Sequence, residues 1–151
     1  PTWSAAQQPG HVEKALLVTR RFAENRAGDH GCLVRALAEA AAWCDEPQHR
    51  EALAEMLAGA AYLNLPARVI APALIGRFDC GQGRVEAVPD FHVFHRGETG
   101  VPTRGRAAAL AAALGGAGLL PPLTARDTEL PGRLFREDLH RALQATTVHT
   151  A

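Results

Sequence analysis

Only one segment of this sequence, residues 14–19, has the pattern of a buried β-strand. It begins with Lys14, continues through the apolar run ALLV and ends in a β-branched threonine. A buried strand must pair with neighbouring strands, because its backbone N–H and C=O groups otherwise lose the hydrogen bonds that water would provide. The pattern therefore predicts either that residues 14–19 are helical or that their sheet partners lie outside this chain.

The rest of the chain is dominated by helical patterns. Apolar residues recur at helical spacing in segments that are bounded by capping residues, prolines or glycines. The predicted helices are residues 20–26 (capped by Thr19), 32–44 (with Asp29 as a candidate cap), 48–58, 66–75 (kinked or interrupted by Pro72), 103–114 and 130–144. Residues 76–83 are predicted to form a glycine-rich turn, residues 91–95 a short extended piece and residues 145–151 a frayed tail. A mostly α-helical chain with one or few strands is expected.

Charge and hydropathy exclude two classes of partner. Sixteen basic residues balance sixteen acidic ones, so the formal net charge is zero. A chain without net charge has no strong electrostatic attraction to nucleic acid or to anionic lipid. The sequence has no apolar run of 18 residues and no signal-peptide pattern in its first residues, and because it opens at Pro1 we expect a processed chain or a fragment.

Motifs for common catalytic chemistry are missing from the sequence. It contains no GxxxxGK[ST], HExxH, CxxC, DxDxDG or GxSxG motif, and the glycine pair at 81 and 83 is typical of a tight turn. Three widely spaced cysteines, Cys32, Cys44 and Cys80, do not make a disulfide framework and are expected to be small buried apolar residues. His30 lies near Cys32, but so close in a helix start that the two side chains do not face each other.

Two further clusters are weak candidates for a site. His92 and His95 would point to opposite faces of an extended segment, so a shared metal ion is not expected there. The adjacent carboxylates Asp45 and Glu46 precede a proline at a helix end and are expected to be solvated. We therefore predict no catalytic residue, no metal and no cofactor, and a small helical enzyme that uses the two histidines is the minor alternative.

Lys14 is the single lysine of the chain and stands at the start of the apolar run. An ammonium group is a compact donor of three hydrogen bonds, which suits a small oxyanion. The alternative is an ordinary surface lysine at the end of a strand.

Several strings along residues 12–144 resemble, in order, the C-terminal part of the nitrate/sulfonate/bicarbonate-type ABC-transporter solute-binding proteins. EKALLVTRRF is similar to a strand-then-helix entry, LVRALAEAAAWCDEPQHREALAEML to "LxRALxEAxxWCDxPxNRxExAxxL", and YLNLPARVIAPALIGRFDCGQGR to "YLNVPxxxIxPSLxGxFDYGxG". VPDFHVFHRGETGVPTRGRAAALAAALGGAGLL resembles "FHVFHRxxxNxPxxxxAxWxLxxMxxxG", and LFREDLHRAL resembles "xFRPDLYRxA". Departures include Cys80 and His140, which stand where the family has tyrosine, and an alanine-rich helix over residues 103–116 without the usual tryptophan and methionine.

The resemblance implies a two-lobed α/β fold of the periplasmic binding protein type II, in which ligand binds between the lobes. Residues 1–19 would be the end of lobe 2 and a crossover strand, residues 20–144 the C-terminal helical part of the fold, and residues 145–151 a tail. The sheet partners of residues 14–19 would then come from a missing N-terminal lobe.

The resemblance also implies a function, which is closest to that of the nitrate/nitrite branch. The protein would be a solute-binding component, not an enzyme, of an ABC-type importer for nitrate, nitrite or a related small inorganic anion. It would act in the periplasm or cell envelope with permease and ATPase subunits, and without direct contact to nucleic acid. Lys14 matches the family lysine that contributes to the anion site, and because the other ligand contacts lie upstream, the chain alone should bind nitrate weakly or not at all. The alternative is a cytoplasmic nitrate/nitrite sensor that sequesters a transcription antitermination regulator.

Overall fold

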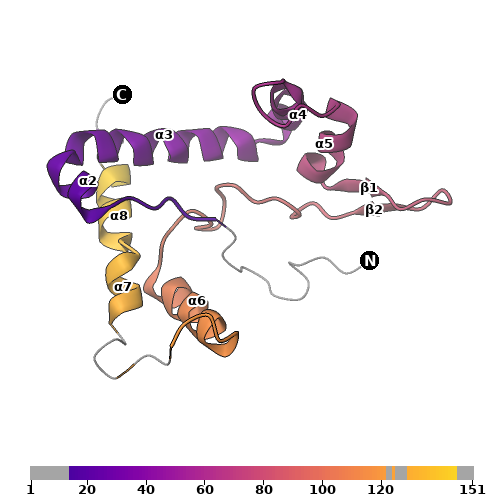
Figure 1. The fold of residues 1–151 in the computed structure, drawn as a ribbon. Helices are drawn as coiled ribbons and strands as arrows, with labels where there is room; N and C mark the ends of the chain where they lie inside the picture. Colours follow the sequence, from indigo (N-terminus) through magenta and orange to yellow (C-terminus); the bar gives the residue numbers. More distant parts are fainter. Residues whose placement is uncertain (1–13, 122–123, 125–128, 146–151) are drawn as a thin grey trace. The chain divides into compact units, whose positions relative to one another are not determined.

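A computed structural model describes residues 14–121, 124 and 129–145 (Figure 1). The elements, in chain order, are α2 (Arg20–Asn25), α3 (Ala27–Asp45), the 3-10 helix η1 (Pro47–His49), α4 (Arg50–Ala58), α5 (Ala67–Ile75), β1 (Arg77–Asp79), β2 (Val85–Ala87), α6 (Arg104–Gly116), α7 (Leu130–Leu134) and α8 (Glu137–Ala145). The prediction of a mostly helical chain with few strands is confirmed. None of the described helices is both long and apolar enough to cross a membrane.

The chain divides into two compact units. One contains the described residues up to 35 and from 101 onward, and the other contains residues 36–100. Residues 1–13 of the predicted crossover region and residues 146–151 of the predicted tail lie outside the described residues.

Residues 14–19 form no strand among the described residues, and the prediction that their sheet partners lie outside this chain stays a prediction. Residues 14–18 have no regular secondary structure and are exposed, with Leu17 at 87% of its full accessible area. No strand among the described residues pairs with this segment, and an isolated strand cannot satisfy its backbone groups. The helix that follows is as predicted, because the Thr19 hydroxyl accepts a hydrogen bond of 3.1 Å from the Phe22 backbone N–H and caps α2.

Helix α3 is longer at its start than the sequence indicates. It begins at Ala27, so Asp29 lies in the first turn instead of capping the helix, where its charge still complements the helix dipole. Asp29 also forms an exposed ion pair of 2.5 Å with Arg26. A side chain at Gly31 would come within 3.1 Å of Leu143, which shows how closely α3 and α8 approach in the first unit.

The second unit is built on the packing of α4 against α5. Their buried contact consists of Leu53, Ala54, Ile70 and Leu74. Pro72 lies inside α5 without ending it, and the helix continues to Ile75. The helix 48–58 predicted from the sequence is a short 3-10 turn followed by α4, which ends before Gly59 as predicted.

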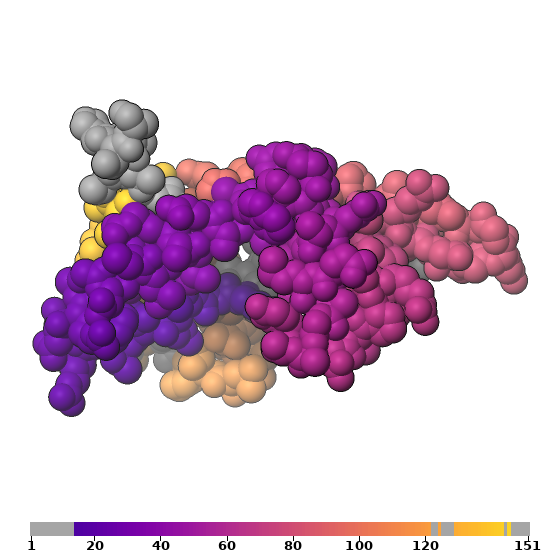
Figure 2. Space-filling model, turned by 90° about the horizontal axis from the view of Figure 1, so that it is seen from above, coloured from indigo at the N-terminus to yellow at the C-terminus, as the bar shows by residue number. Residues whose placement is uncertain are grey.

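A β-hairpin follows α5 where the sequence indicated only a glycine-rich turn. Strands β1 and β2 are antiparallel, with Phe78 opposite Glu86. Gly81 and Gly83, at the tip, have left-handed backbone angles, and the Asp79 carboxylate accepts a 2.8 Å hydrogen bond from the Gly81 N–H. In Figure 2 the hairpin extends away from the α4–α5 surface of its unit.

The first unit contains α6, α7 and α8. The Thr103 hydroxyl caps α6 by accepting from the Arg106 N–H at 3.2 Å. The single helix predicted over residues 130–144 is two helices, because Phe135 takes an extended conformation between them. Helix α6 packs against α7 where the side chain of Arg104 lies over Gly132, which has no side chain of its own.

Gly76→Ala should destabilise the second unit far more than Gly81→Ala. Both glycines have a positive φ, of 71° and 81°, but a methyl group at Gly76 would overlap the Val88 carbonyl, whereas Gly81 faces open space. The left-handed conformation alone costs alanine about 1–2 kcal/mol. The overlap at Gly76 should add about 1–3 kcal/mol to the loss in unfolding free energy, measured by urea denaturation. Equal losses for the two variants would show that Val88 moves aside freely.

Candidate functional site

Lys14 is exposed and lies in the segment without regular secondary structure. Among the residues that the structure describes, no hydrogen bond or ion pair involves its ammonium group. Lys14, the candidate anion-binding residue predicted from the sequence, therefore makes no polar contact that stabilises the described part of the fold.

The other residues considered from the sequence do not assemble into a metal or catalytic site. No group of three His, Cys, Asp or Glu side chains that could hold a metal occurs among the described residues. The ring of His92 lies between Phe91 and Phe94, with centroids 5.0 and 5.9 Å away, so it packs as an aromatic residue.

The cysteines are free thiols in different surroundings. Cys44 packs against the α4–α5 core, and burial raises the pKa of its thiol, so it is an inert residue as expected. Cys80 is half-buried. Cys32 is exposed, which contradicts the expectation of a buried residue, and the Arg35 guanidinium donates to its sulfur at 3.3 Å.

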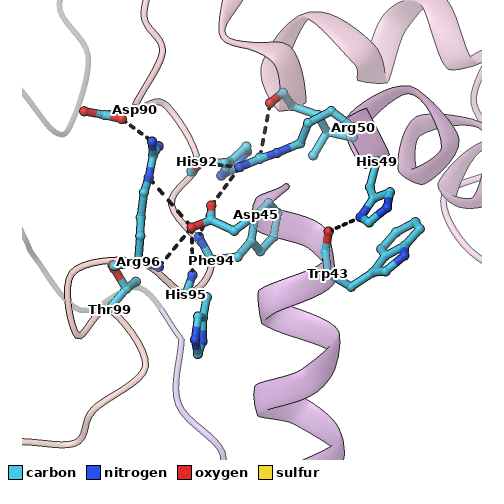
Figure 3. A network of polar contacts seen from close by, with 11 residues as sticks. Trp43, Asp45, His49, Arg50, Asp90, His92, Phe94, His95, Arg96 and Thr99 are labelled. Carbon is cyan, nitrogen blue, oxygen red and sulfur yellow. Dashed lines mark hydrogen bonds and ion pairs between the residues drawn. The ribbon is translucent and has the colours of Figure 1, made fainter. Parts of the chain in front are cut away.

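The most organised group of polar contacts surrounds Asp45 and Arg50 (Figure 3). Asp45 is the last residue of α3 and Arg50 is the first of α4, and their side chains form an ion pair of 2.8 Å. The two side chains are only 9% and 8% exposed. The expectation that Asp45 is solvated is therefore wrong.

The Asp45 carboxylate also accepts hydrogen bonds from three consecutive backbone N–H groups. Phe94, His95 and Arg96 donate at 3.2, 3.4 and 2.9 Å. Burial, the largest single influence on this carboxyl, opposes its ionisation, but the three N–H donors and the charge of Arg96 together outweigh it. The pKa of Asp45 is consequently below its ordinary value, and the group is ionised at neutral pH.

Arg50 completes the group by binding two backbone carbonyls. Its guanidinium donates to Leu74, in the last turn of α5, at 3.2 Å and to His92 at 3.3 Å. It also lies 4.8 Å from the centre of the Phe94 ring. We refer to Asp45, Arg50 and the backbone of residues 92–96 as the Asp45–Arg50 clasp.

Trp43 and His49 extend this region at the end of α3. Their rings stack at 4.3 Å with an interplanar angle of 9°, and His49 Nδ1 lies 2.9 Å from the Trp43 carbonyl oxygen. These contacts join α3 to η1.

The Asp45–Arg50 clasp holds backbone segments together and is not arranged as a ligand site. Its charges neutralise each other and its donors are directed at internal acceptors. Its residues fall in two of the strings that carry the family resemblance, WCDEPQHRE and FHVFHR. Their joint presence is the sequence signal that could have indicated a contact between them.

Comparison with known proteins finds similarity to components of nitrate and bicarbonate transport. The NMT1-like family model matches residues 2–58. The chain is 30% identical over 96 residues to the nitrate import ATP-binding protein NrtC of Synechocystis sp., which covers 63% of this chain and 14% of NrtC. It is 28% identical over 102 residues to the bicarbonate-binding protein CmpA of Synechococcus elongatus, covering 64% of the chain and 23% of CmpA. The nitrate/nitrite binding protein NrtA of the same species is 32% identical over 74 residues, covering 49% of the chain and 17% of that protein.

The fold agrees with these matches. The crystal structure of the periplasmic nitrate-binding protein NrtA from Synechocystis PCC 6803 superimposes with a TM-score of 0.82 at 20% identity, and the match covers 93% of this chain and 37% of NrtA. The chain is similar to nitrate- and bicarbonate-type substrate-binding proteins. The resemblance and the periplasmic binding protein fold expected from the sequence are thus confirmed. The chain spans less than a quarter of the length of each of these curated relatives.

Asp45→Asn should lower the free energy of unfolding by about 3 kcal/mol, because it leaves the buried guanidinium of Arg50 without its counter-charge. Asp90→Asn is the matched control. Asp90 forms a 2.6 Å ion pair with Arg96, but its side chain is 73% exposed, so this change should cost no more than about 0.5 kcal/mol. Urea denaturation of both variants measures the difference, and similar losses would show that the Asp45–Arg50 clasp contributes no more than a surface pair.

The stabilisation from Asp45 should also depend on pH. Because the folded-state pKa of Asp45 is lowered, its contribution is complete above the unfolded value near 3.8 and is lost as the pH falls through the folded value. The difference in unfolding free energy between the native protein and Asp45→Asn should therefore be constant from pH 7 to pH 5 and shrink below pH 3.8. A difference that shrinks already near pH 6 would mean that another group titrates.

Proposed function

We propose that this chain is part of a binding protein for a small oxyanion, such as nitrate, nitrite or bicarbonate, that serves an importer. The observation that carries the proposal is the match of 93% of the chain, at a TM-score of 0.82, to a periplasmic nitrate-binding protein. The names of NrtA and CmpA support an anion as ligand, and they differ in which anion is bound.

Lys14 is the residue proposed to contact the anion. A small oxyanion that leaves water requires donors that replace its hydration, and one cation among N–H groups meets this need. Lys14 is exposed, unpaired within the described part of the chain and lies inside the segment matched by the family model. In this proposal residues 1–19 are the end of lobe 2 and a crossover strand, and a further N-terminal lobe supplies the remaining ligand contacts.

The partners follow from the same proposal. An importer requires membrane-embedded permease subunits and an ATPase, and the match to NrtC supports a connection to such a system. The chain itself has no phosphate-binding loop, so we assign it no role in ATP hydrolysis. An export or lipoprotein signal at the start of the complete gene would support the periplasm or cell envelope as its location, and a direct cytoplasmic start would favour an anion sensor instead.

Lys14→Ala, made in the protein expressed from its complete gene, should weaken anion binding by about 1.5–3 kcal/mol, the usual contribution of a hydrogen bond to a charged group. Isothermal titration with sodium nitrate, sodium nitrite and sodium bicarbonate measures the affinities. Because Lys14 is exposed and unpaired within the described residues, its removal should leave the free energy of unfolding unchanged.

Arg68→Ala is the control for loss of one exposed positive charge, and it should bind the anion as tightly as the native protein. Unchanged affinity in Lys14→Ala would show that this lysine is an ordinary surface residue. Failure of the native protein to bind any of the three anions would refute the proposed function itself.

A further inference from the structure

The hairpin formed by β1 and β2 is a sheet with two open edges. Its strands pair with each other, and neither has a second neighbour among the described residues (Figure 1). Neither strand contains a proline or a bulge, the two features that commonly prevent further pairing at an edge. Each outer edge can therefore accept another strand.

Hydrogen bonds at the two ends of the hairpin show which backbone groups point outward. The Val88 N–H donates to the Gly76 carbonyl at 2.7 Å, and the Cys80 N–H donates to the Arg84 carbonyl at 2.9 Å. In an antiparallel ladder, hydrogen-bonded pairs of residues alternate with pairs that are not hydrogen-bonded. The middle residue of β1, Phe78, is therefore bonded to β2, and the residues on either side of it are not.

These two residues are Arg77 and Asp79, whose backbone N–H and C=O groups point away from β2. Both residues are exposed, and no backbone hydrogen bond outside the hairpin uses them within the described part of the chain. One oxygen of the Asp79 carboxylate accepts from the Gly81 N–H at 2.8 Å, which leaves the other oxygen able to accept. The edge of β1 thus presents a positive charge, an aromatic ring and a negative charge in succession.

This order of residues makes the β1 edge complementary to itself. If two copies of β1 pair in antiparallel fashion about a twofold axis at Phe78, Arg77 of each copy lies opposite Asp79 of the other. The outward N–H and C=O groups of these residues then occupy hydrogen-bonded positions, as a regular ladder requires. Opposite charges and aromatic rings that face each other across neighbouring strands stabilise the pairing. A twofold contact of this kind is closed and ends at two copies.

The outer edge of β2 does not have this property. Its outward residues are Val85 and Ala87, so the same pairing would place the Glu86 side chains of two copies directly opposite each other. Like charges in this position destabilise a pair of strands. Of the two edges, β1 is the one suited to a second copy.

We propose that β1 is a dimerisation edge, at which a second copy of this protein pairs to join the two hairpins into one sheet. The strand is three residues long, so the contact is small beside the roughly 800 Å² per partner that stable dimers bury. The association is therefore weak, with a dissociation constant on the order of 0.1–1 mM. It involves neither Lys14 nor the Asp45–Arg50 clasp, so it is independent of the proposed anion binding.

Sedimentation equilibrium of the protein expressed from its complete gene, up to about 1 mM, measures this association. Arg77→Asp and Asp79→Arg should each abolish it, because each change places like charges opposite one another at both ends of the contact. An equimolar mixture of these two variants should associate again, since opposite charges then meet across the edge. Arg84→Asp is the matched control, because it makes the same change of charge at the exposed hairpin tip outside β1, and it should associate like the native protein.

A native protein that stays monomeric over this range would overturn the proposal. Association of Arg77→Asp that equals that of the native protein would do the same, as would a monomeric mixture of the two variants when circular dichroism shows that both are folded. Asp79→Arg also removes the hydrogen bond to the Gly81 N–H. If that variant does not fold, the comparison of Arg77→Asp with Arg84→Asp decides the question alone.

Discussion

The position of the Arg50 guanidinium determines how the second unit is assembled. One planar group binds the carboxylate at the end of α3, a carbonyl in the last turn of α5 and a carbonyl 42 residues further along the chain from Arg50. Helix ends leave carbonyl groups without partners, and a buried end must find donors elsewhere. Arginine can meet several such acceptors at once because its donors are fixed in a plane.

The Asp45–Arg50 clasp fixes the positions of backbone segments more than it adds net stability, although breaking it by removing one partner is costly. Removing two charges from water is costly, and the attraction between them repays that cost only when the remaining donors and acceptors are also satisfied. Asp45 meets this condition through the consecutive N–H groups of residues 94–96, which lie some fifty residues away in the sequence. The clasp thereby fixes a loop that has no regular secondary structure of its own.

Local signals in the sequence predicted the helices and missed the features that depend on distant contacts. Thr19, Gly59 and Thr103 mark helix ends because each acts on backbone groups within a few residues. The strand predicted over residues 14–19 is not formed among the described residues, because a strand exists only with a partner and none is available there. Strands β1 and β2 were missed because three residues are too few to show an alternating pattern.

Asp45 was misjudged because its burial is produced by residues that no local pattern connects to it. The family strings identified these residues without indicating their contact. The contact of Lys14 with an anion stays a prediction, because no local pattern in the sequence tests it.

The placement of the β-hairpin has a consequence for engineering. The hairpin lies between Leu74 and His92 in the sequence. Arg50 donates hydrogen bonds to the carbonyls of both residues, so the segment that contains the hairpin is fixed at both ends. Its tip at residues 81–84 is exposed, and a methyl group at Gly81 or Gly83 would meet no neighbouring atom. Exposed tips of this kind tolerate inserted sequence. The hairpin can therefore be lengthened at its tip to accommodate an epitope or a fluorophore-labelling tag, while the hydrogen bonds of Arg50 to Leu74 and His92 are kept.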